Sequence, residues 1–161
     1  MKTIKFTHEL IKGKIAEMIF EQMLRDAGGF TILGFGYEKV VPELAHMKKS
    51  KEAQKTLEVV RRAPDFAIIN HETNKVHLIE VKYRSRLSAL EVKRTAGKMK
   101  ESWNPSYLFI ATPKGFYFDS VEAVIEKEGK IDPLNHPKLS QRLQDGYLKL
   151  LNEFITQKTK K

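Results

Sequence analysis

A glutamate and a lysine stand two residues apart in the segment HLIEVKYR, residues 77–84, which otherwise has the apolar pattern of a strand. Side chains alternate between the two faces of a strand, so Glu80 and Lys82 share one face. Charged groups are costly to bury unless they are paired with an opposite charge or bind a metal ion. The chemistry that these two residues can carry therefore depends on which groups lie beside them.

The preceding segment DFAIIN supplies a second acid, Asp65, because it reads as a strand joined to the first by the short connection HETN. A two-residue turn centred on positions 72–73 would place Asp65 opposite Glu80. A turn centred on positions 73–74 would place it opposite Lys82 instead. In both registers the two acids and the lysine lie on one face, so they are predicted to converge at one end of a hairpin.

Two neighbouring carboxylates repel each other unless a cation or a shared proton lies between them. A hard divalent cation such as Mg²⁺ binds to one or two carboxylates and keeps several of its waters. A neighbouring lysine can orient or deprotonate such a water and can stabilise developing negative charge. This combination suits the attack of hydroxide on a phosphodiester. The alternative is an ordinary ion pair between Glu80 and Lys82 on an exposed strand, which would contribute little to stability.

The residues that carry this arrangement, Pro64-Asp65 followed by Glu80-Val81-Lys82, resemble the motif of the PD-(D/E)XK nuclease superfamily. That superfamily includes type II restriction enzymes, archaeal Holliday-junction resolvases and nucleases of DNA repair and recombination, and its shared core is α-β-β-β-α-β. The resemblance implies that Mg²⁺, with Mn²⁺ as a substitute, is bound by Asp65, Glu80 and the backbone carbonyl of Val81. It also implies that Lys82 helps to activate water.

Many members of the superfamily carry a further glutamate on the first helix, and here the segment KGKIAEMIFEQMLRDAGG offers Glu17. On a helical wheel Glu17 lies at the margin of the apolar stripe, whereas Glu21 points further out. The resemblance, to the resolvase-like branch in particular, thus makes Glu17 an auxiliary catalytic residue and metal ligand. An ordinary solvated position stays open for Glu17, because acids at the margin of a helix are common.

The elements that must position these residues are predicted from hydrophobic periodicity and from the positions of glycine and proline. A helix is expected over residues 7–27, where apolar residues recur at helical spacing and Gly28-Gly29 ends the pattern. A polar, lysine-rich insertion, helical in part, follows the first strand at residues 39–62. The other expected elements are strands at 30–38, 65–70, 75–84, 106–112 and 115–120 and helices at 88–102 and 138–156.

Together with the resemblance, this order predicts an α/β protein with a restriction-endonuclease-like core, α-β-β-β-α-β, in which helices flank a mixed sheet. All 161 residues are expected to form a single nuclease-like domain. In the C-terminal helix at 138–156, the apolar residues at helical spacing are expected to cover the core. A homodimer interface is the second interpretation of that stripe.

The chain is strongly basic, with a formal net charge of +9. Such a charge favours polyanionic partners, most often nucleic acid, through phosphate contacts and the release of counterions. A merely solvated helix face is the alternative for the basic residues that follow the candidate site. Their position directly after that site favours contacts with DNA phosphates for a set of six: Arg84, Arg86, Lys93, Arg94, Lys98 and Lys100.

Several function classes are disfavoured by what the sequence lacks. It has no run of about eighteen apolar residues, so no membrane span is expected. The absence of cysteine excludes thiolate zinc sites and fits a cytoplasmic location. No dinucleotide or Walker fingerprint is present, so no small-molecule cofactor is expected. The expected function is a Mg²⁺-dependent DNA nuclease, and the alternative is a non-catalytic DNA-binding module of the same fold.

Overall fold

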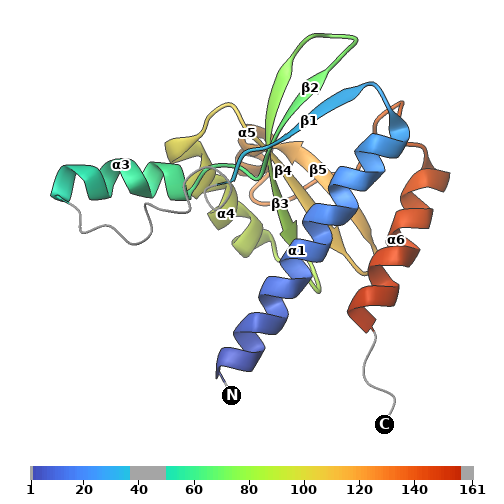
Figure 1. Ribbon diagram of the computed structural model, residues 1–161, viewed down its shortest axis with the longest axis horizontal. Coiled ribbons are helices and arrows are strands. Elements are labelled where there is room, and N and C mark those ends of the chain that lie inside the picture. The colour runs from blue at the N-terminus through green and yellow to red at the C-terminus, as the bar shows by residue number, and fades with distance from the viewer. Residues whose placement is uncertain (1, 37–49, 157–161) are drawn as a thin grey trace.

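The computed structural model of the chain, which describes residues 2–36 and 50–156, has a five-stranded sheet with helices on both faces (Figure 1). The predicted α/β class, with a mixed sheet flanked by helices, is thereby confirmed. The elements in chain order are α1 (Lys2–Ala27), β1 (Phe30–Gly34), α3 (Lys51–Arg61), β2 (Phe66–Asn70), β3 (Val76–Tyr83), α4 (Ala89–Ser102), β4 (Tyr107–Thr112), β5 (Gly115–Ser120), α5 (Val121–Glu126) and α6 (Gln141–Thr156).

The strands lie across the sheet in the order β1-β2-β3-β4-β5, which is also their order in the chain. β3 and β4 run parallel, and the other neighbouring pairs run antiparallel. A parallel pair needs a crossover connection, which α4 provides. The strand predicted at residues 115–120 is present as β5, at the edge of the sheet.

The predicted hairpin is formed by β2 and β3. Phe66 pairs with Ile79, and this is the register in which Asp65 stands opposite Glu80. The connection comprises residues 71–75 rather than the two-residue turn assumed from the sequence. Inside it, the N–H groups of Glu72 and Thr73 donate to the side-chain oxygen of Asn70 at the end of β2. The loop is therefore longer than expected, while the register is one of the two that were predicted.

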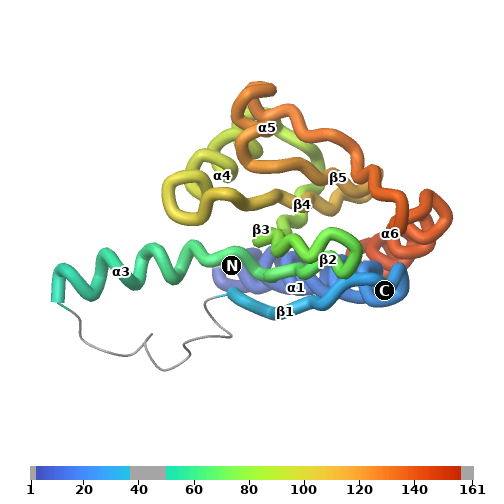
Figure 2. The backbone as a smooth tube through the Cα atoms, turned by 90° about the horizontal axis from the view of Figure 1, so that it is seen from above, coloured from blue at the N-terminus to red at the C-terminus, as the bar shows by residue number. Residues whose placement is uncertain are grey.

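Two helical layers enclose the sheet, with α1 and α6 on one face and α4 and α5 on the other (Figure 2). On β3, the side chains of Ile79, Val81 and Tyr83 are buried in the core under α1. Because side chains alternate along a strand, Glu80 and Lys82 face the opposite side of the sheet. The strand is thus anchored by its apolar residues and presents its charged residues to the other face.

The charged residues of β3 also lie where the sheet is incomplete. β2 begins at Phe66, so beyond Ile79 the ladder of β3 continues on the β4 side alone within the described part of the chain. The β2 side of this stretch is open to side chains from other elements. This opening is the structural basis of the site described below.

The helix α1 begins earlier than predicted and ends at the predicted residue. The helix begins at Lys2 rather than at the predicted residue 7, because no glycine or proline interrupts the first turns. It ends at Ala27 as predicted, and Gly28 and Gly29 then take left-handed φ values of +70° and +81°. The first strand ends at Gly34, earlier than predicted.

The C-terminal helix covers the core, as the sequence predicts. It begins at Gln141 rather than at residue 138, because the Ser140 hydroxyl accepts the N–H of Leu143 at 3.2 Å and acts as the N-cap. Leu151 is fully buried against α1 and the sheet, whereas Phe154 is exposed. The homodimer interpretation stays a prediction.

Within the insertion, residues 39–49 lie outside the described part of the chain, and α3 occupies the rest. Ser50 caps α3 by accepting the N–H of Ala53 at 3.2 Å. The helix extends away from the body of the protein (Figures 1 and 2). Its base is tied to the C-terminal end of α4, where the indole N–H of Trp103 donates to the Val59 carbonyl at 2.8 Å.

The short helix α5 was not predicted from the sequence, because its single buried turn is too brief to show a helical period. None of the helices in residues 2–36 and 50–156 is long and apolar enough to cross a membrane.

Candidate active site

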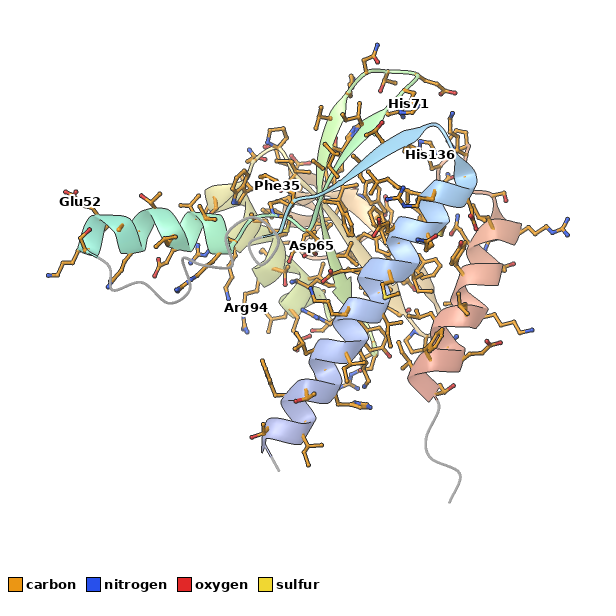
Figure 3. The ribbon with its side chains drawn as sticks, viewed as in Figure 1. Phe35, Glu52, Asp65, His71, Arg94 and His136 are labelled. Atoms are coloured by element: carbon orange, nitrogen blue, oxygen red, sulfur yellow. The ribbon has the colours of Figure 1, made fainter. Side chains whose placement is uncertain are left out.

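A cleft of about 380 Å³ opens where α1, the end of α3 and the open end of β3 meet. Figure 3 shows Asp65 near the centre of the molecule, between α3 and α1 in this view. All the residues predicted to bind metal or to act in catalysis line this cleft, and they come from α1, the start of β2 and β3: Glu17, Asp65, Glu80, Val81 and Lys82. The structure thus brings together residues that are up to 65 positions apart in the chain.

Asp65 stands immediately before β2, and neighbouring backbone holds both its main chain and its side chain. Its carboxylate oxygen Oδ2 accepts the N–H of Val81 at 2.8 Å. Its carbonyl oxygen accepts the N–H groups of Phe35 and Gly36 at 2.8 and 3.3 Å. The carboxylate therefore continues the β2–β3 ladder past the first residue of β2, and its position is fixed by the sheet rather than by a free rotamer.

The backbone of Val81 is oriented by the same hydrogen bond. In an extended strand, the N–H and C=O groups of one residue point to the same side. Since the N–H of Val81 points to Asp65, its carbonyl oxygen faces the open edge where Asp65 lies. This is the orientation that a backbone ligand for a cation at Asp65 requires.

Burial and a second carboxylate raise the pKa of Asp65. Desolvation is the larger cause and the negative charge of Glu80 the second, and together they raise the pKa of Asp65 from 3.8 to about 6. The hydrogen bond from Val81 and the positive charges of Lys82 and Lys14 oppose this rise without cancelling it. The carboxylate thus lies in a position where an additional positive charge would be stabilising.

Glu80 and Lys82 form an ion pair on the face of β3 that they share. The Glu80 side chain is only 14% exposed and the Lys82 side chain 35% exposed, so the pair lies within the cleft. The alternative of an ordinary pair on an exposed strand therefore does not describe it. The ammonium group of Lys82 is thus held beside the acid pair.

Glu17 reaches the cleft from α1, with a side chain that is 16% exposed. Its carboxylate accepts from the ammonium group of Lys14 at 3.3 Å, one helical turn away. Glu21, the other acid considered on this helix, instead pairs with Arg25 at 2.7 Å. The choice of Glu17 over Glu21 as the acid in the cleft agrees with the structure, and its role as a metal ligand stays a prediction.

The donor set in the cleft fits a hard divalent cation. Asp65 and Glu80 supply carboxylate oxygens, and Val81 supplies a carbonyl oxygen at the same edge of β3. Within residues 2–36 and 50–156, no three acidic or histidine side chains converge closely enough to hold a metal ion by themselves. The set is therefore a carboxylate pair with a carbonyl, which matches Mg²⁺ because that ion keeps several waters.

The raised pKa leads to a first prediction, on stability. The folded-state pKa of Asp65, about 6, lies above the ordinary value of 3.8. The contribution of the neutral Asp65 carboxyl to stability is therefore fully present below the lower value and is lost as the pH rises through the higher one. At about pH 8 without metal, Asp65→Asn is expected to raise the free energy of unfolding by on the order of 2 kcal/mol. The amide oxygen can still accept the N–H of Val81, but the amide carries no charge.

Urea unfolding at about pH 8 and about pH 4 measures this effect, because the advantage of the variant should vanish at the lower pH. Asp132→Asn is the matched control, since Asp132 is 65% exposed and pairs with Lys127 outside the cleft. An advantage for Asp65→Asn that is the same at both pH values would show that charge is not its cause.

The structure places the six predicted phosphate-binding residues in different surroundings. Arg84 lines the cleft, donates to the Tyr83 carbonyl at 2.9 Å and lies 3.9 Å from Glu91. Lys93 on α4 is paired with the exposed Glu128, and its role as a phosphate contact stays a prediction. The remaining four are exposed, and Figure 3 shows Arg94 on the outer side of α4: Arg86, Arg94, Lys98 and Lys100.

Two basic residues in the cleft lie outside the set of six predicted phosphate contacts, Lys14 on α1 and Arg61 at the end of α3. Lys14 could have been found, because it lies one turn before Glu17 on the same side of a predicted helix. Arg61 belongs to the basic residues of the insertion, whose claim to phosphate contacts was the weaker one because the sequence left the fold of that segment unclear.

Comparison of the sequence with models of known protein families and with curated proteins finds no match. The function of this chain is therefore inferred from the chemistry and geometry of the cleft.

Proposed function

We propose that the protein is a metal-dependent DNA nuclease with a restriction-endonuclease-like core, related to the PD-(D/E)XK superfamily. One observation carries the proposal: Asp65, Glu80, the Val81 backbone and Lys82 converge in a single cleft, with Asp65 buried beside a second carboxylate. The observed element order also contains the α-β-β-β-α-β succession, with α3 inserted between β1 and β2. A protein that only bound DNA would gain nothing from two adjacent acids facing its polyanionic ligand.

In the proposed reaction, Asp65, Glu80 and the Val81 carbonyl would hold Mg²⁺, which would supply Lewis-acid activation of the phosphate and of the attacking water. Hydrolysis forms a bond between the water oxygen and phosphorus, breaks one P–O ester bond, and leaves a proton for the departing oxygen. The ammonium group of Lys82, held by Glu80, donates hydrogen bonds to the phosphate oxygens as negative charge builds on them. Glu17 and Lys14 form an ion pair on the α1 wall of the cleft.

DNA is the proposed substrate because the net charge of +9 favours a polyanion, and exposed cations lie on α4, the helix that connects β3 to β4. The alternative, a non-catalytic DNA-binding module of the same fold, shares the basic surface but needs no acid pair. The two differ in a single observable, which is whether phosphodiester bonds are broken in the presence of Mg²⁺.

The test is incubation of the protein with supercoiled, linear, single-stranded and branched DNA, in Mg²⁺ and in EDTA. Cleavage of at least one substrate in Mg²⁺ and none in EDTA is expected. Binding without cleavage of any of the four substrates would favour the DNA-binding module.

A second prediction concerns the DNA-binding surface. Changing both Arg94 and Lys98 to glutamine should weaken DNA binding about equally for all sequences. The slope of the logarithm of the binding constant against the logarithm of the salt concentration should become shallower by roughly one unit for each phosphate that the variant no longer neutralises. The matched control changes one arginine and one lysine, Arg142 and Lys149, which are exposed on α6 behind the opposite face of the sheet. Fluorescence anisotropy over a range of salt concentrations measures both doubles, and equal slopes for them would place the DNA elsewhere.

A further inference from the structure

The cleft is lined by basic side chains in addition to the lysine that pairs with Glu80. Within the described residues, four basic side chains line it, and they come from three parts of the chain: Lys14 on α1, Arg61 at the end of α3, and Lys82 and Arg84 at the end of β3. Four acids line it as well, namely the three predicted ones and Glu9. With all eight groups ionised, the lining is electrically balanced.

A divalent cation at the acid pair changes this balance to an excess of two positive charges. Each phosphodiester in a nucleic acid carries one negative charge, so the occupied cleft matches two phosphates rather than one. The reacting phosphate must lie beside Asp65, Glu80 and Lys82, where the metal ligands are. The second phosphate must then be met by the basic groups on the other walls, from α1 and α3.

Contacts at the C-terminal end of α3 hold Arg61 beside the cleft. Leu57 is buried, and the Val59 carbonyl accepts the indole N–H of Trp103 on the adjoining segment. The next residue, Arg62, is drawn to α4, where it pairs with Glu101 at 3.3 Å, and it does not line the cleft. Two consecutive arginines therefore have different surroundings, and Arg61 is the one that lines the cleft.

On the basis of the proposed nuclease function, we propose that Arg61, assisted by Lys14, binds the phosphate adjoining the reacting phosphodiester. The cleft is then a site for two consecutive phosphates, and its natural substrate is a linkage inside a polynucleotide rather than an isolated phosphate ester. A guanidinium group suits this task because it binds phosphate oxygens with two parallel hydrogen bonds. In this way the insertion before Asp65 contributes to substrate recognition.

The test compares Arg61→Ala with Arg62→Ala on two substrates. For an oligonucleotide, Arg61→Ala should raise KM by about 10- to 100-fold, which is the effect of losing a charged hydrogen bond, with a smaller change in kcat. For bis(p-nitrophenyl) phosphate, which has no neighbouring phosphate, its rate should stay within about twofold of wild type. Arg62→Ala should resemble wild type on both, and Arg61→Lys should recover part of the loss by keeping the charge.

Equal losses on both substrates would overturn the proposal, because Arg61 would then act at the reacting phosphate or support the fold. Equal effects of Arg61→Ala and Arg62→Ala would overturn it too, since only bulk charge would matter. A wild-type protein that cleaves neither substrate contradicts the proposed nuclease function instead. In that case oligonucleotide affinity in Ca²⁺ decides, and an Arg61→Ala affinity equal to that of Arg62→Ala rejects the subsite.

Discussion

Replacing Asp65 by asparagine is expected to abolish Mg²⁺-dependent DNA cleavage, with a loss on the order of 10³-fold or more. The amide can still accept the N–H of Val81, so the hairpin and the cleft should keep their geometry. The asparagine amide carries no negative charge, however, so Glu80 is then the single carboxylate of the former acid pair. The same variant is expected to be more stable than wild type above neutral pH, so activity and stability should change in opposite directions.

Single-turnover cleavage at saturating protein measures this loss without confusing it with weaker DNA binding. Asp132→Asn serves again as the control, because it removes an exposed acid outside the cleft. Cleavage by Asp65→Asn at the wild-type rate would remove Asp65 from the mechanism. A parallel drop in the Asp132→Asn variant would point to a general effect of charge.

The second large effect is expected at Lys82. Its ammonium group lies beside the acid pair, so its charge should matter most in the transition state, when negative charge on the phosphate is greatest. Lys82→Ala should lower the single-turnover rate by about 10²–10⁴-fold while changing DNA affinity by less than about tenfold. Lys82→Gln keeps the length and some hydrogen bonding but not the charge, and it should recover little of the rate.

Metal affinity provides an independent check on Lys82. The lysine is paired with Glu80, so removing it should leave that carboxylate better able to hold a cation, and metal binding should be retained or tightened. Lys75→Ala is the control, because Lys75 lies at the other end of the same hairpin and does not line the cleft. A Lys82→Ala variant that cleaves as fast as Lys75→Ala would exclude Lys82 from the reaction.

The parts of the site that could be predicted are those set by local rules. Alternation along β3 puts Glu80 and Lys82 on one face and buries Ile79 and Val81 on the other, as the sequence pattern requires. Either hairpin register brings Asp65 to the charged face, so its placement did not depend on the turn being correct. The choice between Glu17 and Glu21 followed from the helical period alone.

The parts that could not be predicted depend on contacts between distant segments. Arg61 lines the cleft because Trp103, in the segment that follows α4, fixes the base of α3. The backbone of Asp65 is held by Phe35 and Gly36, which follow a strand that ended earlier than expected. Likewise, the ion pair that occupies Lys93 involves Glu128, a residue that no local pattern connects to α4.

The proposed mechanism requires that Asp65 and Glu80 together hold a divalent cation. Titration with Mn²⁺, followed by electron paramagnetic resonance of the unbound ion, measures this directly in the DNA-free protein. Wild type is expected to bind Mn²⁺, in competition with Mg²⁺, and both Asp65→Asn and Glu80→Gln should lose that binding while Asp132→Asn retains it. Mn²⁺ binding that is unchanged in Asp65→Asn and Glu80→Gln, or that is absent from wild type, would contradict the mechanism.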